Sequence, residues 1–223
     1  MQSKLLIQAI TKFLMGLILV SILLILPAGT IHYWNAWLFM GVLFIPMFIA
    51  GLILLLKSPD LLGKRLNVKE EETEQKQVIG LSLLMFVGSF VVAALDFRYS
   101  WSKLPDWVII AAVIIFLISY GLYAEVMREN AYLSRTIEVQ ENQKVIDTGL
   151  YGIVRHPMYF VTVFLFLSIP FILGSVYSFI IFLIYPFLVV KRIKNEEAVL
   201  REALTGYVEY TKKVKYRLIP FIW

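Results

Sequence analysis

Long apolar stretches alternate with short polar segments along the chain. A helix that crosses a bilayer needs about 20 mostly apolar residues. Four stretches fit this requirement, around residues 13–28, 34–56, 78–95 and 107–127. Residues 1–128 are therefore predicted to form an N-terminal part of four transmembrane helices.

A fifth apolar block, residues 160–190, is too long for one spanning helix. Gly174 and Ser175 divide it into two arms of roughly 15 residues each, and both residue types favour turns. The block predicts a helical hairpin with short or tilted arms. The hairpin brings the expected number of spans to six, or to five if it does not cross fully.

Polar residues return after Val190, with apolar positions at Ile193, Leu200 and Leu204 in helical spacing. This pattern predicts an amphipathic helix that lies along the membrane face. Residues 129–223 are thus expected to form a second part of the chain, with the hairpin and a cytoplasmic tail. The predicted fold class is an all-α integral membrane protein with about six transmembrane helices.

The basic residues predict the orientation. With the N-terminus inside, 19 of the 21 Lys and Arg lie in cytoplasmic segments, and only Arg98 and Lys103 lie outside. Such a bias is the rule for short loops of membrane proteins. Both termini and the polar segments near residues 57–77, 128–158 and 191–223 are therefore expected on the cytoplasmic face. Residues 69–74 are expected to form a solvated charged turn.

Composition narrows the class of protein further. The chain is 60% hydrophobic and its mean hydropathy is +0.78, whereas soluble domains are about 45–50% apolar. The net charge of +5 follows from the cytoplasmic excess of Lys and Arg, so nucleic acid is not an expected partner. Without cysteine and with two distant histidines, no metal site is expected. No dimerisation motif indicates an oligomeric state.

The segment DTGLYGIVRHPMY, residues 147–159, carries the most distinctive chemistry. It sets Arg155, His156 and two tyrosines between apolar segments. One interpretation is a helix start, because Pro157 suits the first turn of a helix and Arg155 suits a membrane edge. The other interpretation is a pocket. A hairpin brings its ends together, so residues 155–159 should lie beside residues 192–197, and Arg, His, Tyr and Glu side chains would converge there.

These residues belong to a longer ordered pattern. It consists of Gly149-x-Tyr151-x-x-x-Arg155-His156-Pro157-x-Tyr159, then Arg192-x-x-x-Glu196-Glu197-x-x-Leu200, Tyr207-Val208-Glu209-Tyr210, Val214 and Ile219-Pro220-Phe221. The pattern resembles the isoprenylcysteine carboxyl methyltransferases and their bacterial relatives, a group that includes phospholipid methyltransferases. The resemblance extends over residues 130–223.

The resemblance implies a membrane methyltransferase that uses S-adenosylmethionine and O-methylates the carboxylate of a prenylcysteine or a similar lipophilic acid. Its substrate would come from the membrane lipids or from a prenylated partner. Arg192 is the implied substrate-binding residue, and Arg192, His156 and Tyr159 are the implied catalytic residues. The implied cofactor contacts are Gln140, Gln143, Lys144, Val145, Ile146, Tyr151, His156, Pro157, Met158, Tyr159 and Glu196.

Two positions depart from the family pattern. The family usually has glycine two residues after the motif tyrosine, where this chain has Val161. The glycine ahead of Tyr207 is shifted to Gly206. Val161 bears on the width and packing of the site, and Gly206 bears on the pose of the tail.

The acceptor chemistry leaves alternatives open. A carboxylate is ionised at neutral pH, since its pKa is about 3.3–3.7, and needs no general base. An amine headgroup of a lipid would need one, and His156 is the candidate. Sterol-type reduction by NADPH is a further alternative; reductases with Arg-His-Pro usually have Asn next, where this chain has Met158. The last alternative is a ligand-binding protein without catalysis.

Overall fold

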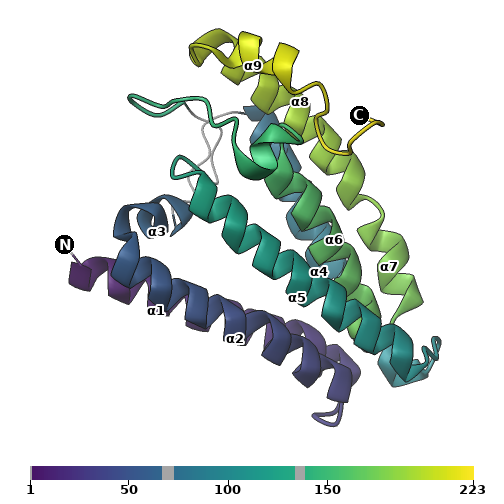
Figure 1. The fold of residues 1–223 in the computed structure, drawn as a ribbon. Coiled ribbons are helices and arrows are strands. Elements are labelled where there is room, and N and C mark those ends of the chain that lie inside the picture. The colour runs from purple at the N-terminus through teal and green to yellow at the C-terminus, as the bar shows by residue number, and fades with distance from the viewer. Residues whose placement is uncertain (1, 67–72, 134–138) are drawn as a thin grey trace.

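The computed structural model describes residues 2–66, 73–133 and 139–223 (Figure 1). Every regular element in these ranges is a helix. The helices are α1 (Gln2–Ala28), α2 (Trp34–Lys57), α3 (Pro59–Leu66), α4 (Thr73–Tyr99), α5 (Asp106–Glu129), the 3-10 turn η1 (Gly149–Gly152), α6 (Pro157–Ile172), α7 (Val176–Phe182), α8 (Tyr185–Ala203) and α9 (Tyr207–Lys213). Residues 69–72 of the expected charged turn lie outside the described residues.

Among the residues that the structure describes, five helical segments are long and apolar enough to cross a membrane. They are Ser3–Ala28, Trp34–Lys57, Lys76–Tyr99, Asp106–Glu129 and Val176–Ala203. The first four confirm the four predicted N-terminal spans, and the chain is that of an integral membrane protein. An all-helical architecture suits this setting, because each helix satisfies its own backbone hydrogen bonds in lipid.

The predicted hairpin is present. Its first arm, α6, has 16 residues and is shorter than the five spanning segments. Gly174 makes the turn with a φ of +79°, which glycine adopts without steric cost. Ser175 then caps the second arm, where its Oγ accepts a hydrogen bond from the backbone N–H of Ser178 at 3.0 Å. A sixth complete crossing by α6 stays a prediction.

The second arm differs from the expectation for the tail. The amphipathic residues do not form a separate helix along the membrane face, because α8 runs without interruption from Tyr185 to Ala203. No glycine follows Tyr185 in α8, and its only proline, Pro186, stands in the first turn, where proline is tolerated. The apolar first half of α8 and its charged second half therefore form one continuous helix.

Three turns meet at one end of the bundle, which we call the turn end. Tyr33, just before α2, donates a hydrogen bond from its hydroxyl to the carbonyl of Leu173 at 2.7 Å. Asn35 donates to the carbonyl of Ile172 at 2.8 Å. The buried Asp96, near the end of α4, accepts hydrogen bonds from the hydroxyl groups of Ser102 and Ser175 at 2.7 and 2.5 Å.

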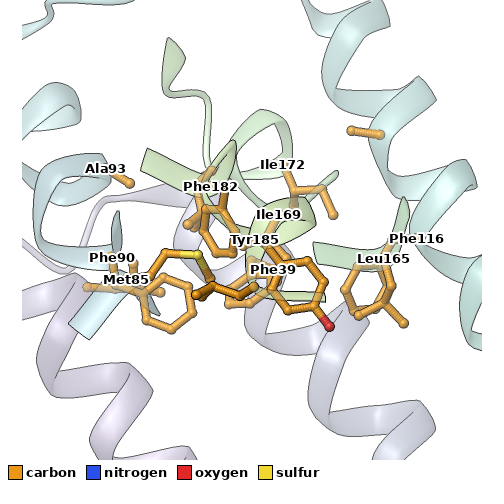
Figure 2. Packing of buried hydrophobic residues seen from close by; sticks show 14 of the residues in the cluster. Phe39, Met85, Phe90, Ala93, Phe116, Leu165, Ile169, Ile172, Phe182 and Tyr185 are labelled. Atoms are coloured by element: carbon orange, nitrogen blue, oxygen red, sulfur yellow. The ribbon is translucent and has the colours of Figure 1, made fainter. Parts of the chain in front are cut away.

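The opposite end, which we call the motif end, carries α3, η1, the start of α6, the end of α8, and α9 (Figure 1). The helices between the two ends pack through a core of aromatic and aliphatic side chains (Figure 2). Phe39 of α2 lies against Phe90 of α4 and Phe116 of α5, with ring centroids 5.7 and 6.4 Å apart. This core fixes α6 and α8 relative to α5, and so sets the elements that carry the motif.

Candidate active site

The motif begins on η1, a short turn held against the end of α5. The carboxylate of Glu129 accepts a hydrogen bond from the backbone N–H of Leu150 at 3.0 Å. Gly149 has a φ of +51°, and a Cβ there would overlap the Glu129 carboxylate. Asn130 donates a hydrogen bond to the hydroxyl of Tyr151 at 3.0 Å. Tyr151 is thereby fixed in position beside the end of α5.

Arg155 holds the C-terminal residues 214–223, which we call the C-terminal strap. Its side chain, 5% exposed, donates hydrogen bonds to the carbonyls of Val214 and Lys215 at 2.8 and 2.9 Å. Its backbone N–H donates to the carbonyl of Tyr216 at 2.9 Å. Arg155 is therefore a structural clamp rather than a charge that flanks the membrane.

His156 and Pro157 begin α6, as the helix-start interpretation predicts. His156 is the N-cap residue and Pro157 occupies the first turn. The backbone N–H of His156 donates to the carbonyl of Arg217 at 2.9 Å, which adds a second link to the strap. The helix start and the pocket are thus compatible interpretations, because the same residues serve both.

Glu197 is the carboxylate that the cationic side chains of the motif end surround. Sequence reasoning assigned no separate role to this residue. It is 3% exposed. Its carboxylate accepts hydrogen bonds from Nε of Arg155 at 2.7 Å and from Nε of Arg217 at 2.9 Å. Nε2 of His156 lies 3.4 Å from the same carboxylate, and Arg201 lies 3.8 Å away. A buried carboxylate needs such partners, because its desolvation is costly.

Arg192, Tyr159 and Glu196 form a continuous chain of hydrogen bonds. Nε of Arg192 donates to the hydroxyl of Tyr159 at 2.8 Å. The same hydroxyl donates to the carboxylate of Glu196 at 2.6 Å. The guanidinium also lies over the Tyr159 ring, with its Cζ 6.0 Å from the ring centroid. The two ends of the hairpin therefore lie together, which confirms the predicted convergence.

A pocket opens at this chain of hydrogen bonds. It contains about 850 Å³ free of protein atoms, part of which is open to solvent. Residues predicted from the sequence that line it are Gln143, Lys144, Val145, Ile146, Tyr151, His156, Met158, Tyr159, Arg192 and Glu196.

Two predicted cofactor contacts are not among the lining residues. The side-chain amide of Gln140 donates to the carbonyl of Tyr132 at 2.7 Å. Gln140 therefore contacts a lining residue without lining the pocket itself. Pro157 is buried at the start of α6. Val161, one of the two departures, is 2% exposed and does not line the pocket. Gly206, the other, adopts a φ of +86° immediately before α9, which explains a glycine there.

Eight further residues line the pocket: Asn130, Tyr132, Leu133, Arg155, Leu200, Leu204, Tyr207 and Tyr210. Tyr207 and Tyr210 come from α9, and the motif includes them as Tyr-x-x-Tyr. That spacing was the available signal, because residues three apart share a helix face. Leu200 and Leu204 were recognised only as the apolar face of a helix.

Burial keeps the pocket tyrosines outside the membrane spans protonated. Burial raises the pKa of Tyr151 to about 12, although the hydrogen bond from Asn130 acts in the opposite direction. Burial also raises the pKa of Tyr207 and Tyr210 well above the usual value for a phenol. The hydroxyl of Tyr207 has no hydrogen-bond partner among the described residues. A buried polar group without a protein partner needs a water or a ligand as its partner, and this hydroxyl lies at the pocket.

The lining suits S-adenosylmethionine. Tyrosine faces favour a sulfonium, as they favour quaternary ammonium groups. The carboxylate of Glu196 is a partner for an ammonium or for ribose hydroxyls, and the Tyr207 hydroxyl can hydrogen-bond a polar ligand group. Apolar walls from Leu200 and Leu204 suit the flat face of an adenine. The residues present therefore fit this cofactor.

Part of the chain matches a known protein family. The family described as phospholipid methyltransferase matches residues 107–205. This range contains every lining residue of the pocket except Tyr207 and Tyr210. Curated proteins give no match to the chain. The match is centred on the pocket and supports a methyltransferase activity in a membrane protein.

Proposed function

We propose that this protein is a membrane methyltransferase that uses S-adenosylmethionine and methylates a lipophilic acceptor, with the carboxylate of a prenylcysteine or similar acid as the preferred acceptor group. The hydrogen-bond chain of Arg192, Tyr159 and Glu196 in the pocket wall carries the proposal. It sets a cation and an anion a few ångströms apart and holds both in fixed orientation.

The two ends of that chain suit the two reactants. S-adenosylmethionine would supply an electrophilic methyl group on a sulfonium sulfur. Glu196 would bind the positively charged part of this cofactor. The guanidinium of Arg192 has the planar donor geometry that a carboxylate prefers. Tyr159 both accepts from Arg192 and donates to Glu196, so its hydroxyl orients its neighbours and is not a base.

Carboxylate methylation requires no general base from this chain of residues. The acceptor is already ionised at neutral pH. The residues then need only to align the reactants and to exclude water. Exclusion helps because bulk water stabilises the separate charges of the two reactants. Met158, Leu200 and Leu204 supply the apolar lining for this exclusion.

Methylation of a lipid amine is the second candidate, and the match to phospholipid methyltransferases favours it. An amine must lose a proton before it attacks. His156 lines the pocket, and its Nε2 lies 3.4 Å from the Glu197 carboxylate. A carboxylate at that distance would orient the ring so that Nδ1 accepts a proton. Loss of amine methylation in His156→Gln would favour the amine acceptor.

Calorimetric binding of S-adenosylhomocysteine to the detergent-purified protein tests the proposal, with NADPH as the comparison ligand. Micromolar binding of the first alone is expected. Binding of NADPH alone would replace the proposal with a reductase, and binding of neither would favour a protein without catalysis.

Variants of α8 test the residue roles. Glu196→Ala should weaken S-adenosylhomocysteine binding, whereas Arg192→Ala should raise the KM for the acceptor. Glu202→Ala and Lys194→Ala are matched controls, since both side chains lie exposed on the same helix. Wild-type affinity in Glu196→Ala, or wild-type acceptor kinetics in Arg192→Ala, would contradict the corresponding role.

A further inference from the structure

The short helix α3 lies at the motif end and is fixed there from two sides. Leu61 and Leu62 are buried, so one face of α3 packs into the protein. The ammonium of Lys12, on α1, donates a hydrogen bond to the carbonyl of Leu66 at the last residue of α3. The helix therefore has a defined position rather than being part of a loose loop.

Two cations project from α3 toward the pocket wall. Nζ of Lys64 lies 5.9 Å from the ring centroid of Tyr132 and 3.4 Å from the carbonyl oxygen of Ala131. Tyr132 lines the pocket. The guanidinium carbon of Arg65 lies 5.4 Å from the ring centroid of Tyr123, on α5. Lys64 therefore lies beside a residue of the pocket wall, and Arg65 is the next residue of α3.

The charge of Arg65 also acts inside the pocket. It lowers the pKa of the Tyr151 phenol, against the larger effect of burial. Tyr151 belongs to the pocket lining. The charge of Arg65 thus reaches the wall that Tyr151 forms, where the carboxylates of Glu196 and Glu129 act on the pKa of the same phenol in the opposite direction.

The position of α3 relative to the bilayer indicates which anion these cations contact. The helix follows the spanning segment Trp34–Lys57 after a single residue, Ser58. The end of a spanning helix lies at the headgroup level of the bilayer. An amphipathic helix at this level buries its apolar face, and its Lys and Arg attract anionic lipids. The abundant anion at that depth is the phosphate of a phospholipid.

We propose that Lys64 and Arg65 form a binding site for the phosphate of a phospholipid at the edge of the pocket. An ammonium offers three N–H donors and a guanidinium five, and the two stems are held against Tyr132 and Tyr123. A phosphate between them would leave the rest of the headgroup beside Tyr132, at the mouth of the pocket. The site itself does not need methyl transfer; only its use for a phospholipid acceptor rests on the proposed function, in its second form of lipid amine methylation.

Binding of short-chain phosphatidylglycerol to the detergent-purified protein, followed by native mass spectrometry, tests the site. Lys64→Gln/Arg65→Gln should lower the affinity at least tenfold and reduce its dependence on salt. Lys57→Gln is the matched control, because Lys57 is an exposed cation at the same end of α2. It should change the affinity less than twofold.

Three outcomes would overturn the site. They are unchanged lipid affinity in the double variant, an equal loss in Lys57→Gln, and equally tight binding of inorganic phosphate, which would assign the cations to a free anion. Binding of S-adenosylhomocysteine, measured in parallel, should be the same in wild type and double variant and so reports an intact fold. If the wild type binds the lipid but not S-adenosylhomocysteine, the proposed function fails and the lipid site stands.

Discussion

Tyr159 joins two opposite charges through one oxygen atom, and this gives its hydroxyl more influence than most tyrosine hydroxyls have. Arg192 and Glu196 lie on one helix, four residues apart, and Tyr159 reaches both from α6. Without the hydroxyl, the two charged side chains would lose the group that fixes their directions. The phenol is thus a positioning group for both reactants of the proposed methyl transfer.

Tyr159→Phe should lower kcat/KM for methyl transfer by about 10–100-fold, because hydrogen bonds to charged groups contribute about 1.5–3 kcal/mol. Steady-state kinetics with the acceptor found by screening measure this change. Tyr185→Phe is the control, since its hydroxyl bonds Thr162 at 3.0 Å and does not line the pocket. Equal activity of the two variants would contradict the role of Tyr159.

Tyr151 should make the protein sensitive to alkali. Burial raises the pKa of the Tyr151 phenol to about 12 in the folded protein, from 10.0 in the unfolded chain. Between these values the unfolded chain releases a proton that the folded protein retains, so stability falls by up to about 1.4 kcal/mol per pH unit. Below pH 10 the contribution is fully present. Thermal unfolding from pH 9 to 11 should show a weaker pH dependence in Tyr151→Phe, and an unchanged dependence would refute the assignment.

Sequence reasoning identified Arg192, Tyr159 and Glu196, but it missed the pocket positions of Tyr207 and Tyr210 and the division of roles between two adjacent glutamates. Glu196 and Glu197 are adjacent, and their order alone does not reveal that Glu196 faces Tyr159 whereas Glu197 faces Arg155. That division depends on where the C-terminal strap passes, and strap position is a tertiary property. For the same reason Arg155 resembled a membrane-flanking charge in the sequence.

At the scale of elements, the hydrophobic pattern was sufficient for the spans, because a stretch of about 20 apolar residues is a strong local signal. It was insufficient where a helix changes environment. The polar residues after Val190 resembled a new helix, although α8 continues through them. Helix α3 was likewise not predicted, since eight residues after Ser58 give too short a pattern.

The turn η1 depends on a glycine that no other residue replaces. Gly149→Ala would set a Cβ on the Glu129 carboxylate and hold alanine at a φ of +51°. Such backbone strain costs about 1–3 kcal/mol. The thermal midpoint should fall and S-adenosylhomocysteine should bind more weakly, because Tyr151 shifts with the turn. Gly121→Ala, within α5 and with open space around its Cβ, should be neutral or stabilising.

At the scale of the whole molecule, the C-terminal strap closes the motif end. Arg155 and Glu197 connect α6, α8 and the strap through buried charges. At the far end of the strap, the carbonyl of Trp223 accepts hydrogen bonds from the backbone N–H groups of Arg217 and Leu218 at 2.9 Å. The site is therefore assembled from segments that are distant in the sequence.

Glu197→Gln should destabilise the protein by about 3–5 kcal/mol, because it leaves the buried guanidinium of Arg155 without its carboxylate. Thermal unfolding in detergent measures the loss, and limited proteolysis should release the strap first. Glu202→Gln, an exposed change on the same helix, is the control. A variant with wild-type stability and a protected strap would mean that the carboxylate is dispensable.

The turn end has a consequence for the evolution of chain length. Tyr33 and Asn35 both bind carbonyls of the turn that ends α6, and Asp96 binds Ser175 in that turn. One residue inserted between Gly29 and Tyr33 would move both donors out of register with their acceptors. Insertions and deletions among homologues should therefore be rare in these three turns and collect instead in the loops of the opposite end.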